Sequence, residues 1–525
     1  MLAALVPVLL TTGCYSWEFS ASGDGRGGGG TGSGGSSTTT GSNGGGGAGG
    51  GSTPAACELT WDHDIERTDA HLFGDEKTDG DTRQEVSSVA IDATSTSFAG
   101  PYESTLNLGG GQLPAATDAS PGVARGVFVA SFTGKSLADT ALRYAVSGQA
   151  TKSIAVSRIA ALPGDKLAVS GTYSGSGALG AYSLPDTTND TFGYVTALDT
   201  QGAKVWGRTL DASTVEIRDL VSTSAGVLVG GRFLGADLKV GSTTYYTDYF
   251  GSAGFAARFD TTTGVDTWVN LLICSVGDAE IRAVATASNG DIYVLANNSA
   301  GFSSGSCTFA SHPMGIAEGD HVLLFRLTAD GTFVSVHTLD SDGPINGIDL
   351  VVVDDDPIVL ATLRGTLKVD GLDKGITTDG TDDMLVAAFD NTGVSAVFKT
   401  YGDTSVIVPR AMVGLGTDVM ILGELAPPAV ALGCPNPFLA EGLRPFLLQL
   451  NPQNGSTRHA ALFDTSSTGT YTLSALDADP GSTGAPYSIA VGGSMSGDAT
   501  LTFDGGVLTM NKSKADAAIA LLSLP

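Results

Sequence analysis

Charged side chains are scarce in this 525-residue chain, at 16% of residues, where typical soluble proteins carry about 25%. Basic residues are the scarcest, with 27 Lys and Arg against 55 Asp and Glu, which gives a formal net charge of -28. A field of that sign repels nucleic acids and anionic lipids. We therefore expect no nucleic-acid partner, and we expect a surface made mainly of Ser, Thr, Asn and Gly.

Residues of the usual catalytic and metal sites are also few. The six histidines show no spacing typical of a metal site, and no Gly-x-Ser-x-Gly motif has suitable Asp and His partners. Acidic residues cluster at 354–356, 379–383 and 477–479, but none of these segments matches a calcium loop, and Asp also favours turns for backbone reasons. We predict no cofactor and no catalytic residue from the sequence, and we leave calcium open.

No hydrophobic run is long enough to span a bilayer, since the apolar segment at 2–10 has only nine residues. Small residues and Cys14 follow it, and this order resembles a bacterial lipoprotein signal, in which Cys14 would become the lipidated N-terminus. Thr11 and the lack of a basic residue before the run depart from that pattern, and plain secretion is the alternative. Tyr15, rather than Asp, after the cysteine points to the outer membrane or cell surface, with the lipid as the only membrane contact.

Gly, Ser and Thr make up nearly all of residues 21–53, so this stretch has no apolar face to bury. We predict a signal segment at 1–14, a disordered linker at 15–56 and one folded domain at 57–525. The linker would tether the domain to its anchor.

The folded part is a diverged repeat. An apolar run closed by a turn, such as HVLLFRLTADG at 321–331, recurs with a period of roughly 65 residues. The last apolar residues of the copies are Phe132, Leu198, Phe259, Leu327, Phe389, Leu450 and Leu524.

Each copy contains four strand-like segments and a Gly- and Thr-rich insertion between the second and third. In the fourth copy these strands are 281–288, 291–298, 321–327 and 333–339, and Asn289-Gly290 is a hairpin signal. Helical periodicity is almost absent. Four antiparallel strands repeated at a fixed period favour radial blades, which predicts an all-β fold, a seven-bladed β-propeller, over a sandwich or a solenoid. The insertions should form protruding hairpins or extend the two central strands.

This layout resembles the bacterial β-propeller repeats of secreted and surface lipoproteins, over about residues 85–525. The resemblance implies a propeller, but it transfers no catalytic residue to this chain. Quinone-dependent dehydrogenases are also propellers, but the adjacent cysteine pair and the repeated Trp motif expected of them are not found in this sequence.

Exported proteins keep disulfide bonds. Cys274 follows the last strand of the third copy and Cys307 lies in the insertion of the fourth, so both should emerge on one face. We predict a Cys274–Cys307 disulfide, and unpaired thiols at Cys57 and Cys434.

Aromatic residues gather in the insertion of the third copy, at Tyr245, Tyr246, Tyr249 and Phe250. They form either a recognition surface, because aromatics provide large rigid contact area, or a patch packed against the blade edge. If they form a recognition surface, at least two should be exposed.

The seventh copy ends after its third strand, so its fourth must come from elsewhere. We predict that residues 58–64 supply it, antiparallel to 517–524, because an unpaired edge would favour aggregation.

Our leading hypothesis is a monomeric, surface-anchored, non-enzymatic propeller that presents loops to an envelope protein or a glycan. The alternative is an extracytoplasmic enzyme, a hydrolase or lyase, with its site at the mouth of the central channel. Ionisable side chains converging there from three or more blades would favour the enzyme. In the first strands that we inspected, the sequence shows little beyond Arg218 and Asp219.

Overall fold

The computed structural model separates residues 1–54 from a second unit, Ala55–Pro525, which is compact. The residues it describes all belong to the second unit. They are 66–524 apart from these gaps: 74–82, 104, 109–112, 117–124, 224–225, 248–250, 302, 379, 391–394, 403–405, 427–428, 431, 433–437, 440–442, 466–469, 480–485, 498–499, 504–505 and 510–511. The predicted lipidation site Cys14, the linker, Cys57, Cys434, Tyr249 and Phe250 lie outside these residues.

The described residues form β-strands, with one 3-10 turn at Asp139–Ala141 and no α-helix. Hydrogen bonding groups the main strands into four-stranded antiparallel units. From the innermost strand outward, the first units are β2 (Ser88–Ile91), β3 (Ser95–Glu103), β4 (Arg125–Thr133), β5 (Leu142–Ala150); β6 (Ser153–Leu162), β7 (Lys166–Ser174), β10 (Thr191–Leu198), β11 (Lys204–Asp211); and β12 (Thr214–Thr223), β13 (Gly226–Leu234), β16 (Ser252–Phe259), β17 (Asp266–Cys274).

The remaining units follow the same plan. They are β18 (Asp278–Thr286), β19 (Ile292–Ser299), β22 (Asp320–Leu327), β23 (Phe333–Ser341); β24 (Ile345–Val353), β25 (Asp356–Leu363), β28 (Asp383–Phe389), β29 (Ser395–Tyr401); β30 (Ile407–Leu415), β31 (Asp418–Leu425), β34 (Arg444–Asn451), β35 (Ser456–Leu462); and β37 (Thr470–Asp479), β38 (Tyr487–Gly497), β41 (Lys512–Leu524), β1 (Glu66–Phe73).

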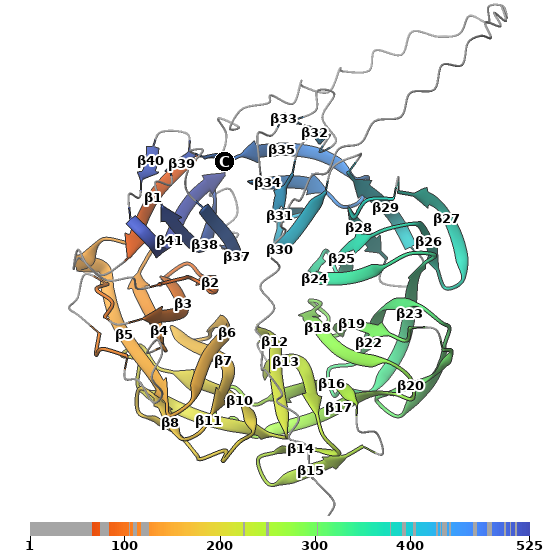
Figure 1. Cartoon of the computed structure of the whole chain (residues 1–525), viewed down its shortest axis with the longest axis horizontal. Helices are drawn as coiled ribbons and strands as arrows, with labels where there is room; N and C mark the ends of the chain where they lie inside the picture. Colours follow the sequence, from red (N-terminus) through yellow and green to blue (C-terminus); the bar gives the residue numbers. More distant parts are fainter. Residues whose placement is uncertain are drawn as a thin grey trace, which may run out of the picture. The chain divides into compact units, whose positions relative to one another are not determined.

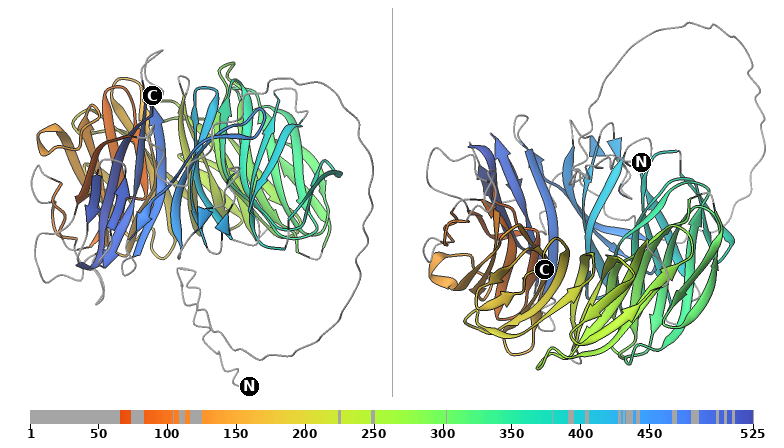
Figure 2. Two further views of the ribbon diagram at one scale, coloured as in Figure 1. Left: turned by 90° about the horizontal axis from the view of Figure 1, so that it is seen from above. Right: turned by 60° about the horizontal axis from the view of Figure 1, so that its bottom comes forward.

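These units stand around a common centre, with their first strands innermost (Figure 1). Each first strand contacts the first strands of the units on both sides, and β2 contacts β37, so the series of contacts returns to its start. In the side view, the strands run next to one another from one face of the second unit to the other (Figure 2). Radial four-stranded antiparallel sheets are the architecture of a β-propeller, which confirms the predicted fold type.

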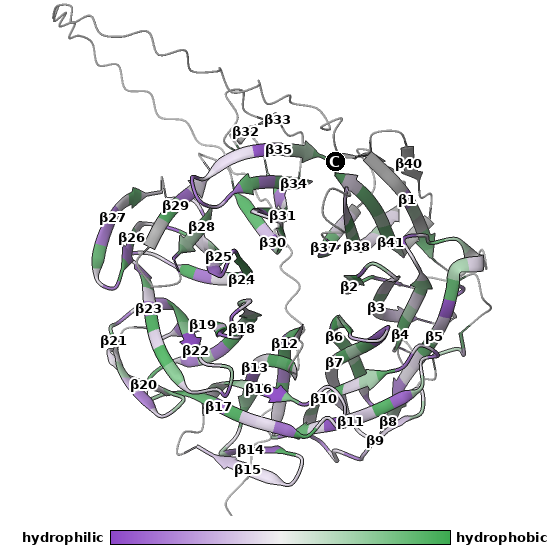
Figure 3. Cartoon of the chain, turned by 180° about the vertical axis from the view of Figure 1, so that it is seen from behind, coloured by the Kyte–Doolittle hydropathy of each residue, from purple (hydrophilic) through white to green (hydrophobic). Residues whose placement is uncertain are grey.

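Hydrophobic clusters hold neighbouring units together. One cluster joins Leu360 and Val386 of one unit to Ile421 and Leu448 of the next, and another joins Val229 and Val195 across a different boundary. Burial on both faces of a sheet explains why third strands such as β22 are nearly continuous apolar runs. The hydropathy colouring shows hydrophilic segments on outer strands such as β29 and β35 (Figure 3).

Most insertions form hairpins, one of the two predicted arrangements, and in the last unit the insertion also extends the central strands, where Gly497 of β38 pairs with Lys512 of β41. The hairpin β14 (Asp237–Val240) and β15 (Thr243–Tyr246) pairs with β11, the outer strand of the preceding unit. The same arrangement is found for the other hairpins that pair with an outer strand: β8 (Gly177–Leu179) and β9 (Tyr182–Leu184) on β5, β20 (Gly305–Phe309) and β21 (His312–Ile316) on β17, and β26 (Thr366–Val369) and β27 (Leu372–Thr377) on β23. Each such hairpin therefore links two units. Shorter pairings occur between β32 (Ala429–Val430) and β33 (Phe438–Leu439), and among β36 (Asp464–Thr465), β39 (Thr500–Phe503) and β40 (Gly506–Thr509).

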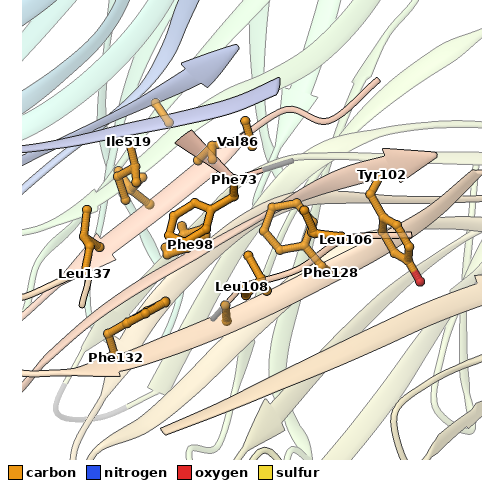
Figure 4. Close-up of a cluster of buried hydrophobic side chains, with 14 of the residues drawn as sticks. Phe73, Val86, Phe98, Tyr102, Leu106, Leu108, Phe128, Phe132, Leu137 and Ile519 are labelled. Carbon is orange, nitrogen blue, oxygen red and sulfur yellow. The ribbon is translucent and has the colours of Figure 1, made fainter. Parts of the chain in front are cut away.

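The first and last strands of the second unit lie in one sheet. β1 pairs antiparallel with β41, from Glu66 opposite Ser523 to Phe73 opposite Ala517. An N-terminal segment thus completes the last unit, but it is 66–73 and not the predicted 58–64. Phe73 accounts for the difference, because its ring packs against Phe98 and Phe132 of the first unit (Figure 4).

Candidate functional site

The innermost strands enclose a central cavity of about 330 Å³. Its walls come from β2, β6, β12, β24, β30 and β37. Four ionisable residues on four of these strands line it: Arg158, Asp219, Asp349 and Asp477. Convergence of ionisable side chains from three or more blades was the feature expected of the enzyme alternative, and the four strands meet it. Of these four residues only Asp219 had been expected from the sequence to lie at the channel.

A β-bulge interrupts most first strands at the same level, directly before Arg158, Asp219 and Asp349. In β12, β18 and β30 the extra residue is an arginine: Arg218, Arg282 and Arg410. A bulge inserts an extra residue, re-aims side chains and breaks the regular alternation of a strand.

Glycine on the second strand makes room for the bulge. A Cβ added at Gly493 would lie 1.9 Å from the Thr472 carbonyl oxygen, and one added at Gly231 would lie 2.1 Å from that of Glu216. No side chain fits at such a distance, so the Gly-rich second strands are a steric requirement of the bulged first strands.

The channel carboxylates connect neighbouring units. Asp219 accepts a hydrogen bond from the Val284 backbone N–H at 2.9 Å, and Asp349 accepts one from Met412 at 2.7 Å. Asp477 accepts one from the Ile91 N–H at 2.9 Å. Each acceptor lies on the first strand of one unit and each donor on that of the next, so these carboxylates hold the ring together.

Burial raises the pKa of Asp349 to about 6, and the nearby Asp219 charge adds to the effect. Burial likewise raises the pKa of Asp477 to about 7, against the opposing effect of the Ile91 N–H. A raised carboxyl pKa means that the folded protein holds a proton that the unfolded chain releases. The contribution of Asp477 to stability therefore falls as the pH rises from about 4 to about 7.

We predict that Asp477→Asn removes this loss, because the amide oxygen can still accept the Ile91 N–H. The free energy of unfolding of the variant, relative to the parent, should increase by up to about 1.4 kcal/mol per pH unit between pH 4 and 7, then level off. Denaturant unfolding at several pH values measures this. Asp186→Asn, which alters an exposed turn carboxylate bonded to the Thr188 N–H, is the control and should show no comparable trend. A pH-independent difference for Asp477→Asn would contradict the prediction.

The arginines on the first strands differ in their partners. Arg218 pairs with Glu216 at 2.7 Å and with Glu280 at 3.2 Å, and Arg410 pairs with Glu424 at 2.7 Å. Arg158 lies 3.6 Å from Asp219.

Arg282 has no hydrogen bond or ion pair within the part of the chain that the structure describes. Burial lowers the pKa of its guanidinium, the charges of Arg218 and Arg158 add to this effect, and those of Glu280 and Asp349 oppose it.

Cys274 and Cys307 are joined by a disulfide bond, with their Cα atoms 4.0 Å apart. Both residues were expected in loops. In the structure they lie directly opposite each other on the paired strands β17 and β20. The bond therefore reinforces the hairpin link between two units.

The aromatic insertion is a strand hairpin and not a free loop. Tyr246 is 76% exposed, whereas Tyr245 is half-buried and its hydroxyl donates to Asp266 at 3.4 Å. One of the two described aromatics is therefore available to a partner.

His321 and His337 hydrogen-bond to neighbouring protein groups. The buried His321 bridges Asp340 and the Ala317 carbonyl oxygen, and His337 contacts Asp370 at 2.9 Å. Among the described residues no group of three His, Cys, Asp or Glu side chains could hold a metal ion. No helix in the described part is long and apolar enough to cross a membrane.

Comparisons with known proteins give structural likeness alone. No family model matches the sequence, and no curated protein matches it. Similar solved structures include a quinohemoprotein alcohol dehydrogenase from Comamonas testosteroni (10% identity, TM-score 0.36, covering 88% of this chain and 76% of that one) and a europium-containing methanol dehydrogenase (8%, 0.35, 88% and 93%). The extracellular domain of a one-component system from B. thetaiotaomicron is a further match (10%, 0.15, 86% and 82%).

These scores support no transfer of activity. The class that the strand pairing and the channel define is a β-propeller with a charged central cavity.

Proposed function

We propose that the protein is a monomeric, seven-bladed propeller that is exported and anchored at the outer membrane or cell surface through lipid on Cys14. It binds a protein or glycan there and does not catalyse a reaction. The repeat count and the four-stranded units support seven blades. The observation that carries the binding role is Tyr246, a large aromatic side chain left 76% exposed on a hairpin that strand pairing holds in place. A rigid exposed aromatic is the type of residue that dominates recognition surfaces.

Four ionisable residues converge in the channel, which is the feature expected of the hydrolase or lyase alternative, but the hydrogen bonds of its carboxylates favour a structural role. A carboxylate that acts as a general acid or base must be free to exchange a proton with a substrate. Asp219, Asp349 and Asp477 are instead bonded to backbone N–H groups of the neighbouring unit. Their geometry is that of structural links.

The test is a glycan array together with a pull-down from envelope extract, using the mature protein. We expect Tyr246→Ala to weaken binding of the captured glycan or protein at least ten-fold, because truncating an aromatic anchor costs about 2 kcal/mol or more. Leu372→Ala is the matched control, since Leu372 is 65% exposed on the different hairpin β26–β27 and should leave binding unchanged. Equal binding by the Tyr246→Ala variant would remove the hairpin from the proposal.

A further inference from the structure

The outward face of the hairpin β14–β15 combines one aromatic ring with polar side chains. Residues directly opposite each other on paired strands share a face of the sheet, with Cβ atoms about 5 Å apart. Tyr246 stands opposite Asp237, and Thr244 stands opposite Lys239. Tyr246, Asp237 and Lys239 are exposed, and Thr244 is half-buried. This face therefore presents a ring with a carboxylate beside it, and a hydroxyl and an ammonium group on the neighbouring pair.

The hairpin is held in place from its other face. Leu238 and Val240 are fully buried there, and the Tyr245 hydroxyl donates to Asp266. β14 also pairs with the outer strand β11, at the rim of the second unit (Figure 1). A surface that is ordered before binding loses little conformational entropy when a ligand docks on it.

The composition of the outward face fits a sugar better than a protein. A stable protein interface buries about 800 Å² per partner around an apolar core. The outward positions of β14 and β15 carry one large apolar side chain, Tyr246, among polar ones. A sugar ring has an apolar C–H face and hydroxyl groups at its edge, so it matches an aromatic ring with a hydrogen-bonding carboxylate next to it.

The charges on this face select among sugars. Asp211 of β11 stands opposite Lys239, so two carboxylates, those of Asp211 and Asp237, accompany one ammonium group. The whole chain has a formal net charge of -28. An anionic sugar therefore meets charge of its own sign both at the face and around it, whereas a neutral sugar does not.

We propose that the outward face of β14–β15 binds a neutral sugar residue of a glycan. The ring of Tyr246 stacks on the C–H face of the sugar, and Asp237 accepts a hydrogen bond from one of its hydroxyl groups. This inference rests on the proposed function and names the ligand of the same hairpin.

Calorimetric titration of the mature protein tests the proposal. The neutral probes are maltohexaose, cellohexaose and chitohexaose, and the anionic comparators are hexasaccharides of hyaluronan and heparin. We expect at least one neutral probe to bind saturably, and the anionic probes to bind more weakly than it or not at all.

Asp237→Ala should weaken binding of the neutral probe about ten-fold, because a hydrogen bond to a charged group is lost, and should leave the unfolding midpoint unchanged. Asp373→Ala is the matched control, since it removes an exposed carboxylate from the different hairpin β26–β27 and should change neither quantity. Tyr246→Phe keeps the ring and should bind as the parent does, whereas Tyr246→Ala should lose at least ten-fold in affinity.

The inference is wrong if no neutral probe binds the parent, if an anionic probe binds more tightly, or if Asp237→Ala binds as the parent does. Capture of an envelope protein that Tyr246→Ala abolishes, with no neutral probe bound, would overturn the sugar and leave the binding role of the hairpin standing. Unchanged binding of every captured partner by Tyr246→Ala would overturn both.

Discussion

Deleting residues 66–73 should lower the unfolding midpoint sharply and expose the outer edge of the last unit to aggregation. β1 is the strand that pairs with β41, and without it the edge from Ala517 to Ser523 is left unpaired. β1 also buries both of its faces, because Phe73 packs with residues of the first unit while Leu72 packs against a cluster shared with the preceding one. Its loss therefore weakens contacts on two sides.

The single change Phe73→Ala isolates the packing contribution. The ring is 1% exposed and stacks on Phe98 with centroids 5.0 Å apart. Truncation of a buried phenylalanine costs about 3–5 kcal/mol. Denaturant unfolding should show a loss in that range. Deletion of 21–53 is the control and should leave the midpoint unchanged, and an equal loss from both deletions would show that β1 does not close the ring.

Gly493→Ala should destabilise the protein by at least about 2 kcal/mol. The added Cβ would lie 1.9 Å from the Thr472 carbonyl oxygen, which belongs to the bulged strand β37 and is backbone, so it cannot move aside as a side chain could. Overpacking of this kind typically costs about 1–3 kcal/mol and more where backbone must shift.

Gly315→Ala is the matched control for this change. Gly315 is also a strand glycine, on the insertion hairpin strand β21, and an added Cβ meets nothing within 4 Å. Its effect on the free energy of unfolding should stay within about 0.5 kcal/mol. Similar losses for the two variants would mean that the second-strand glycines do not serve the bulges.

Much of the architecture could be predicted from the sequence because the third strand of each copy is apolar and ends at a recognisable turn. Leu327 is the last residue of β22, and Gly331 in the following turn has φ 82°, a backbone conformation that favours glycine. These local signals fix strand order and the propeller fold. The pairing of each insertion with the preceding unit was not predictable, because it depends on contacts between copies.

The channel was largely missed for a physical reason. Regular alternation does not predict which way Asp219 and Asp349 point, because a bulge directly precedes each of them. The second-strand glycines opposite the bulges were a usable signal, since they occur in several copies. The closing strand was assigned eight residues too early, because the packing of Phe73 against the first unit is a contact between distant copies and has no local sequence signal.

Hydrogen exchange measured by mass spectrometry tests the closed ring most directly. Peptides covering 66–73 and 517–523 should be protected together, and to a similar degree as the central strands β22 and β28. Phe73→Ala should accelerate exchange in both peptides at once. Exchange of 66–73 within seconds while 517–523 stays protected would contradict the closure, and with it the account of this chain as a ring held by its two ends.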